Sequence, residues 1–425
     1  MQARVAETHH ELSRSRAHCA GRARFRKVAS AAAMPQDRRT APAGEQVMQR
    51  PRPRLLFVIT EDWFFTSHFL ERGAAAVRAG YEVAVATRRT TKSGLIEAHG
   101  ITVIPIDFSR RGLNPLGELR TALRLRRIVR RFRPDIVHNV ALKPVVTGTF
   151  GELLAGAPRI VNAPVGMGHV FTTEGHGPRL VRPLLKLLLR RLLNPHGSCV
   201  IIENEDDLHD LVAGRFVRPN SIWLVKGAGV DVNAFRPGEE PAGPITVLLV
   251  ARMLRDKGVL EFVEAARRVR GERPGTRFVI VGGPDAGNPS SFRESDMRRW
   301  EESGDVECLG FRDDVAELLS ACHIACLPSY REGLPKSLLE ATAAGKPIVT
   351  TDVPGCRSVV HDGVNGLLVP ARDAGALARA IVRLVDSPPL RAAMGAAGRR
   401  RAELEFSSTA IIDQTLRIYA GMVSP

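Results

Sequence analysis

Two carboxylates, Glu332 and Glu340, stand eight positions apart and bracket a Gly-Leu-Pro turn at 333–335. The apolar run 324–327 before them is typical of a buried strand, so the loop lies at the carboxyl edge of a predicted sheet, where open α/β sheets bind ligands. Proline favours the first turn of the following helix, whose unpaired N–H groups attract phosphate. Carboxylates suit sugar or ribose hydroxyls. The segment therefore indicates a sugar-nucleotide site; the alternative is a helix with a solvated glutamate at each end.

Two cations follow a second predicted strand, 245–250. Arg252 and Lys257 belong to the segment 251–258, and an amphipathic helix comes after it. Arginine can grip a diphosphate through paired N–H groups and lysine adds a point charge, so a diphosphate leaving group would need no metal. A solvated basic loop is the alternative. The two motifs follow different strands of one predicted sheet. Their occurrence together by chance is much rarer than the occurrence of either motif alone.

Short β-rich runs alternate with helical patterns over the first half of the chain, which predicts a doubly wound parallel sheet. A Pro- and Gly-rich stretch, 236–244, is the best linker. The predicted strands before it are 54–60, 81–87, 101–106, 135–138, 159–162, 199–202 and 222–225.

A second series of strands follows the linker and predicts a second α/β domain. The two domains would face each other across a cleft lined by the carboxyl ends of both sheets. We expect an N-terminal domain at 54–235, a C-terminal domain at 236–407 and a last helix within 408–425. The strands of the second series are 245–250, 277–283, 306–309, 324–327, 347–350 and 366–369.

Length and composition agree with this organisation. A chain of 425 residues has room for two cores, and 44% hydrophobic and 25% charged residues are ordinary for a globular protein. Only 5% of the residues are aromatic, which argues against a carbohydrate-binding β-sandwich or a base-stacking nucleic-acid module.

The net charge of +16 is concentrated in two places. Residues 1–54 hold 12 basic and four acidic residues, and residues 110–133 hold nine arginines against Glu118. We expect 1–53 to be a disordered extension, either untranslated, with Met34 or Met48 as the true start, or a basic membrane-binding tail.

Two predicted helices could meet a membrane. The helix 116–132 is basic and amphipathic, and 181–193 is more apolar and ends in a basic pair. Each could lie on an anionic membrane surface; the alternative is a core helix with solvated arginines. No nucleic-acid partner is expected, because no aromatic residues interleave with the basic helix and no known motif occurs.

No metal site is expected. Cys322 and Cys326 flank His323, but that segment is predicted to be a helix end running into a strand. Cysteines without a C-x-x-C spacing fit a reducing cytoplasm, and no apolar run is long enough for a transmembrane helix. The six cysteines are Cys19, Cys199, Cys308, Cys322, Cys326 and Cys356.

Four segments, 252–258, 332–340, 343–355 and 361–370, resemble the retaining family 4 glycosyltransferases of the GT-B fold. The resemblance implies two Rossmann-like domains, a nucleotide-sugar donor in the C-terminal domain, no metal cofactor, and a last helix, 408–422, that crosses back to the N-terminal domain. It also implies these donor-site roles: Arg252 and Lys257 on the diphosphate, Glu332 on the sugar, Glu340 on the ribose, and Gly333, Leu334 and Pro335 in the phosphate-facing turn.

The N-terminal domain would bind the acceptor. Segments 63–68, 137–144 and 162–171 resemble the subset that builds O-antigen, capsule or glycan precursors on a polyprenyl diphosphate, which places His68, Lys143 and His169 on the acceptor side. His138 could polarise or deprotonate an acceptor hydroxyl; the alternative is a hydrogen-bonded structural histidine. Many relatives carry a second histidine where this chain has Val140, so the usual histidine assignment does not transfer directly.

The sequence thus leads to the hypothesis of a cytoplasmic, peripherally membrane-associated, retaining glycosyltransferase. It would move a hexose or N-acetylhexosamine from a nucleotide sugar, with uridine implied by the resemblance alone, to a polyprenyl-diphosphate-linked saccharide. Two alternatives stay open. One is a non-transferring GT-B enzyme such as a UDP-N-acetylglucosamine 2-epimerase, which would not explain the carboxylate pair. The other is a catalytically silent scaffold that binds a nucleotide sugar.

Overall fold

The structure is a computed structural model that describes residues 52–108, 115–157, 159–165, 181–285 and 287–423, and only the backbone over 181–186. Nearly all of the basic extension expected at 1–53 lies outside these residues. From Pro51 onward the chain forms one contiguous unit.

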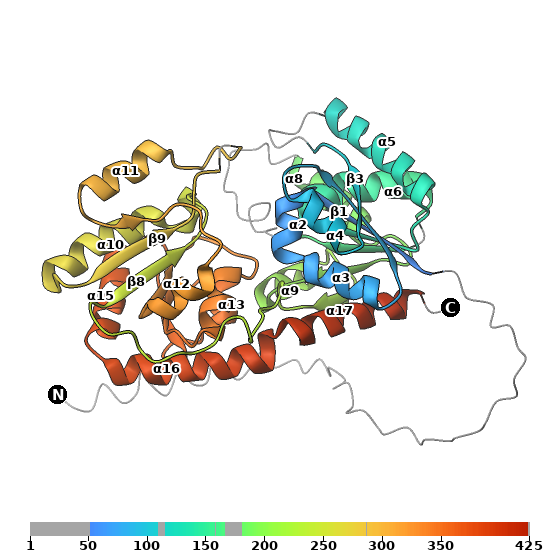
Figure 1. The fold of residues 1–425 in the computed structure, drawn as a ribbon. Coiled ribbons are helices and arrows are strands. Elements are labelled where there is room, and N and C mark those ends of the chain that lie inside the picture. Colours follow the sequence, from blue (N-terminus) through green and yellow to red (C-terminus); the bar gives the residue numbers. More distant parts are fainter. Residues whose placement is uncertain (1–51, 109–114, 158, 166–180, 286, 424–425) are drawn as a thin grey trace, which may run out of the picture. The chain divides into compact units, whose positions relative to one another are not determined.

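The first half of the chain builds a sheet of seven strands in the order β3-β2-β1-β4-β5-β6-β7 (Figure 1). All of its pairings are parallel, as predicted. The bounds of each expected strand differ from those of an observed strand by at most two residues. The strands are β1 Arg54–Glu61, β2 Glu82–Arg88, β3 Thr102–Pro105, β4 Ile136–Val140, β5 Ile160–Ala163, β6 Cys199–Ile202 and β7 Ile222–Leu224.

Helices cover both faces of this sheet because its strands alternate their apolar side chains between two cores. Leu55 and Phe57 of β1 share a core with the C-terminal helix α17 (Ser408–Val423), whereas Leu56 and Val58 share the other with α5. Because these parallel strands are buried on both faces, their sequences are nearly continuous apolar runs. The other helical segments of this half are α2 Asp62–His68, α3 Leu70–Arg78, α4 Ser93–Ala98, α5 Pro115–Phe132, the π-turn η1 Pro144–Gly148, α6 Thr149–Ala155, α8 Val181–Leu193, α9 Glu205–Ala213 and the 3₁₀ turn η2 Pro219–Ser221.

The second half builds a six-stranded parallel sheet in the order β10-β9-β8-β11-β12-β13, with β8 and β11 at its centre. The fold class expected from the sequence, two doubly wound parallel sheets, is confirmed. The strands are β8 Thr246–Val250, β9 Arg277–Val281, β10 Glu307–Cys308, β11 Ile324–Leu327, β12 Ile348–Thr351 and β13 Gly366–Val369. The helical segments are η3 Arg255–Lys257, α10 Val259–Glu272, α11 Glu294–Glu302, α12 Val315–Ala321, α13 Lys336–Ala343, α14 Cys356–Val359, α15 Ala374–Val385, α16 Pro388–Arg401 and the π-turn η4 Ala402–Phe406.

Side chains tie the linker to the second sheet. His323 accepts the Thr246 N–H at 3.1 Å through Nδ1 and lies 3.0 Å from the Pro241 carbonyl oxygen through Nε2. Glu240 pairs with the buried Arg391 of α16. His323 is therefore occupied by backbone contacts. The boundary between the domains at residues 235 and 236 stays a prediction.

The chain passes between the two halves at two neighbouring segments. The Val230 N–H donates to the Phe406 carbonyl at 2.8 Å, and the Ser408 N–H donates to the Val230 carbonyl at 2.9 Å. Gly229, with φ of +74°, lies so close that a Cβ atom there would be 2.7 Å from Ser408 Cα. Helix α17 then runs along the first half, where Tyr419 is fully buried (Figure 1).

Helix α13 begins one residue later than the sequence suggests. Pro335 has φ of −70° and ψ of 117°, which is extended rather than helical, so it is the N-cap and Lys336 is the first helical residue. Glu340 is consequently the fifth residue of α13.

Candidate active site

The carboxylate Glu332 and the cation Lys257 come together at the centre of the second sheet. Lys257 lies in η3 after β8, and Glu332 lies in the loop after β11, the strand beside β8. Lys257 Nζ is 2.5 Å from Glu332 Oε1, and the Ser329 hydroxyl donates to the same oxygen at 2.6 Å. Both charged side chains are largely buried, with 16% and 11% of their surface exposed. A ligand that binds here meets a fixed pair of opposite charges.

Arg252 follows the same strand, β8, as Lys257. Its Nη1 donates to Asp285 Oδ2 at 2.9 Å, and its guanidinium carbon lies 5.7 Å from the ring centroid of Trp63 in α2. The side chain is 46% exposed. Arg252 therefore reaches a residue of the first half while keeping N–H groups at the surface.

Glu340 is buried inside α13. Only 7% of the residue is exposed, and burial raises the pKa of its carboxyl although Lys336 Nζ lies 3.3 Å away. A raised pKa favours a protonated carboxyl, which can donate as well as accept a hydrogen bond to a hydroxyl.

The turn Gly333-Leu334-Pro335 is packed against the first half of the chain. The Gly333 carbonyl accepts a hydrogen bond from Asn204 Nδ2 at 2.8 Å, and a Cβ atom on Gly333 would lie 2.5 Å from Glu203 Oε2. Leu334 is 8% exposed and lies close to Gly227. A side chain at position 333 would therefore displace the carboxylate of Glu203.

Burial raises the pKa of Glu203 to about 7, and the nearby positive charge of Arg72 opposes that shift. Arg72 is itself buried and donates to the Gly227 carbonyl at 2.9 Å. Sequence reasoning missed both residues. Glu203 follows β6 at the carboxyl edge of its sheet, a position that could have indicated it; Arg72 lies inside α3 and offers no such signal.

His138 is completely buried in β4. Its Nδ1 lies 2.5 Å from the Tyr419 hydroxyl, and its ring packs against Phe57 and Phe69. Burial and the positive charge of Arg72 hold its pKa well below the ordinary value for histidine. This placement favours the structural role that the sequence left open, because a sealed, neutral imidazole does not meet an acceptor hydroxyl.

His68 is half-buried at the end of α2. Its ring stacks on Phe64 with 4.3 Å between centroids, and its Nδ1 lies 2.6 Å from the Ser67 hydroxyl. Burial, helped by the positive charge of Lys336, lowers its pKa to about 3. His68 is therefore neutral at physiological pH, with its Nδ1 within hydrogen-bond distance of the Ser67 hydroxyl.

Lys143 pairs with Glu118 at 2.7 Å and shares a cavity of about 830 Å³ with Arg252. The cavity thus brings one expected acceptor-side residue and one expected donor-side residue together. His169 lies outside the described residues. The cavity is lined by Thr60, Phe108, Pro115, Glu118, Leu119, Ala122, Leu142, Lys143, Val146, Thr147, Phe150, Leu188, Leu189, Leu192, Arg252, Asp285, Gly287, Asn288 and Pro289.

Within the described residues, no group of three or more His, Cys, Asp or Glu side chains could hold a metal ion. Cys322 and Cys326 are both buried, and burial raises the pKa of each thiol. The Cys322 thiol lies 3.3 Å from the Leu319 carbonyl oxygen.

Known proteins match both halves of the chain. A family model described as "Glycosyl transferase 4-like" matches residues 54–194, and one described as "Glycosyl transferases group 1" matches residues 232–401. The N,N'-diacetylbacillosaminyl-diphospho-undecaprenol alpha-1,3-N-acetylgalactosaminyltransferase of Campylobacter jejuni is 30% identical over 338 residues, which cover 76% of this chain and 87% of that protein.

Two further proteins are similar. The UDP-Gal:alpha-D-GlcNAc-diphosphoundecaprenol alpha-1,3-galactosyltransferase of Escherichia coli is 25% identical, covering 74% of this chain and 82% of its own. The crystal structure of Anabaena HepE in complex with UDP-glucose has a TM-score of 0.69 and 19% identity, covering 87% of this chain and 99% of that one. The last similarity concerns the fold alone, which is that of GT-B glycosyltransferases.

Proposed function

Because this chain belongs to the glycosyltransferases described by these two family models, we propose that it transfers a hexose or N-acetylhexosamine from a UDP-sugar to a polyprenyl-diphosphate-linked saccharide. Two relatives support this acceptor class, since both are named for transfer to an undecaprenyl-diphosphate-linked sugar. The product would enter the assembly of a cell-surface polysaccharide or glycan.

The observation that carries the proposal is the Lys257–Glu332 pair, with Arg252 as a second cation after the same strand, β8. A nucleotide-sugar diphosphate would take Lys257 and Arg252 as counter-charges, and Glu332 would then accept hydrogen bonds from the donor sugar. Glu340 would meet the ribose, and the turn 333–335 would face the phosphates. Positive charge placed where the leaving diphosphate develops its own negative charge stabilises the transition state, so the reaction would need no metal cofactor.

The reaction would proceed with retention of configuration. The C1–O bond to the distal phosphate breaks and its electron pair stays on the phosphate oxygen. The acceptor hydroxyl oxygen bonds to C1 from the same face and its proton passes to the departing phosphate oxygen. No base from the first half of the chain is required for this step, which agrees with the buried position of His138.

The acceptor would enter the cavity that Lys143 and Arg252 share, where Lys143 supplies a positive charge for the acceptor's diphosphate. His68 would hydrogen-bond the acceptor as a neutral imidazole. His169 stays a prediction on this side of the site.

A leucine-rich face beside this cavity suits a membrane surface. Helices α5, α6 and α8 carry exposed large apolar residues, and α5 packs against α6. Exposed arginines of α5 and α8, such as Arg120, Arg124 and Arg190, add positive charge for anionic lipids. Within the described residues, no helix is long and apolar enough to cross a membrane. The apolar residues of this face are Leu116, Leu119, Leu123, Phe150, Leu153, Leu154, Leu187 and Leu188.

We therefore infer that the protein works at the cytoplasmic face of the membrane, where a polyprenyl-diphosphate acceptor presents its sugar. No nucleic acid is a partner in this proposal. The basic face serves lipids instead.

The test replaces Glu332 by glutamine. Loss of one preorganised hydrogen-bonding group at the reacting centre costs a factor of about 10²–10³ in kcat. We expect Glu332→Gln to lose transfer to that extent while its melting temperature still rises on addition of UDP without magnesium, as for the unaltered protein. Glu302→Gln, in an exposed part of α11, is the matched control. Undiminished transfer by Glu332→Gln would contradict the assignment, and a complete absence of transfer by the unaltered protein would support a silent scaffold.

A further inference from the structure

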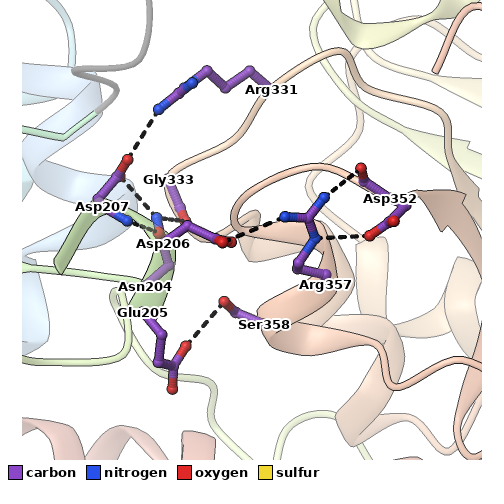
Figure 2. Close-up of polar contacts among 9 residues, drawn as sticks. All are labelled: Asn204, Glu205, Asp206, Asp207, Arg331, Gly333, Asp352, Arg357 and Ser358. Carbon is purple, nitrogen blue, oxygen red and sulfur yellow. Dashed lines mark hydrogen bonds and ion pairs between the residues drawn. The ribbon is translucent and has the colours of Figure 1, made fainter. Parts of the chain in front are cut away.

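The start of helix α9 contacts the second half of the chain through four consecutive polar residues (Figure 2). Two of these contacts are with the loop that carries Glu332, and the other two are with α14. The four contacts are Asn204 Nδ2 to the Gly333 carbonyl at 2.8 Å, Asp207 Oδ1 to Arg331 Nη2 at 3.0 Å, Asp206 Oδ1 to Arg357 Nη1 at 3.3 Å, and Glu205 Oε2 to Ser358 Oγ at 3.1 Å.

Asn204 is held in one orientation. It is fully buried, its Oδ1 accepts the Asp207 N–H at 2.8 Å as the N-cap of α9, and its Nδ2 donates to Asp207 Oδ2 at 2.9 Å. The same Nδ2 reaches the Gly333 carbonyl. Because the cap fixes Asn204 and Asp207 together, both partners in the loop are held by one rigid helix start.

The loop is held from both halves of the chain. Within the second half, the Tyr330 N–H donates to the Asp256 carbonyl at 2.8 Å, and Lys257 and Ser329 contact the Glu332 carboxylate. Glu332 lies between Arg331 and Gly333, and these two neighbours are the residues that Asp207 and Asn204 hold. Arg331 and Asp207 are well shielded from solvent, with 18% and 14% of their side chains exposed. An ion pair removed from water in this way is screened less than a surface pair. On the opposite side, the Glu332 N–H reaches the Pro354 carbonyl at a longer 3.3 Å.

We propose that Asn204 and Asp207 are positioning residues for Glu332, so that the domain which binds the acceptor also sets the geometry of the carboxylate facing the donor sugar. The inference rests on the proposed function for the role of Glu332, but the positioning itself concerns only the loop. It gives the enzyme a physical link between its two substrates, because the docked start of α9 fixes the residues on either side of Glu332.

Asp207→Asn tests the link, with Asp206→Asn as a matched control. Both variants remove one negative charge from the first turn of α9 at the same interface, but Asp206 is paired with Arg357 of α14, which also binds Asp352, and not with a residue of the loop 331–334 (Figure 2). We expect kcat to fall at least tenfold in Asp207→Asn and less than threefold in Asp206→Asn, with the Kd for UDP within threefold of the unaltered protein in both. The charge exchange Asp207→Arg with Arg331→Asp should recover at least fivefold over either single change.

Hydrogen exchange of the loop amides at 331–334 gives a readout that needs no transfer. We expect faster exchange in Asp207→Asn than in the unaltered protein, and no change in Asp206→Asn. Equal losses of kcat in the two variants, or unchanged loop exchange in Asp207→Asn, would overturn the proposal. If the unaltered protein transfers no sugar while Asp207→Asn still loosens the loop, the positioning stands and the proposed function fails.

Discussion

His138 and Tyr419 form a buried pair whose partners lie 281 positions apart in the sequence. Without Tyr419, a histidine at the end of a strand reads as a candidate for acid-base chemistry. With it, one ring nitrogen is occupied, and the other, Nε2, is buried without a hydrogen-bond partner among the residues that the structure describes. Removing the Tyr419 hydroxyl therefore distinguishes a catalytic role of His138 from a structural one.

Tyr419→Phe should affect stability rather than turnover. The change leaves His138 Nδ1 without its partner inside the core, which costs about 1–3 kcal/mol of the free energy of unfolding. Thermal unfolding should show a lower melting temperature, and kcat should stay within threefold. Tyr81→Phe, whose ring packs on Tyr419, is the control and should change the melting temperature less. A large loss of kcat at an unchanged melting temperature would instead indicate that His138 takes part in catalysis.

The residues of the donor site were largely predictable, because each lies where a strand ends. Lys257 and Glu332 follow neighbouring strands, and the structure places them in contact. The contacts of Glu203, Asn204 and Asp207 were not predictable in the same way. The pattern at 204–207 indicates a helix cap, but nothing in the sequence says which distant loop a capping residue will also bind.

Helices α5, α6 and α8 show how far an element can be understood from its own sequence. The amphipathic pattern predicted α5 and α8 with nearly correct bounds, but α6 adds Phe150, Leu153 and Leu154 to the same apolar face. Its contribution depends on packing against α5, which the local pattern does not contain.

Charged substitutions on this face should release the protein from anionic vesicles. Leu119 and Leu153 are both 46% exposed, so glutamate at either position costs little stability but opposes burial in lipid and adds like charge to the surface. We expect Leu119→Glu and Leu153→Glu each to lower the affinity for phosphatidylglycerol vesicles, measured by co-sedimentation, roughly tenfold, equivalent to about 1.4 kcal/mol. Leu404→Glu, in an exposed turn of the second half, should bind as the unaltered protein does. Equal binding by all four proteins would place the membrane contact elsewhere.

At the scale of the whole molecule, the sequence predicted the two sheets well, because parallel strands buried on both faces leave apolar runs that are easy to recognise. It did not predict a cluster of three buried polar side chains on β4, β5 and α6. Asn139 of β4 donates to Glu152 Oε2 at 2.9 Å and to Asn162 Oδ1 at 3.1 Å, and all three residues are fully buried. Local sequence patterns treat such residues as surface residues.

Glu152 should make the stability of the protein depend on pH. Burial raises its pKa from 4.5 to about 8, so between these values the folded protein keeps a proton that the unfolded chain releases. Stability is therefore lost as pH rises through that window. Glu152→Gln cannot ionise, so its advantage over the unaltered protein should grow by about 4 kcal/mol between pH 4.5 and pH 8.5. Melting curves at both pH values test this, with exposed Glu97→Gln as control. A pH-independent difference would show that the carboxyl titrates normally.

The burial of α17 in the first sheet also has a consequence for the order in which the protein is made. The ribosome releases the N-terminal strands first, yet the core around β1 and β4 includes Ile411, Ile418 and Tyr419 near the end of the chain. The core of the second sheet closes with residues up to Phe406 and can form earlier. The half of the molecule that is synthesised first would therefore be the last to complete its folding, and until the final helix emerges its apolar surface is left for chaperones to cover.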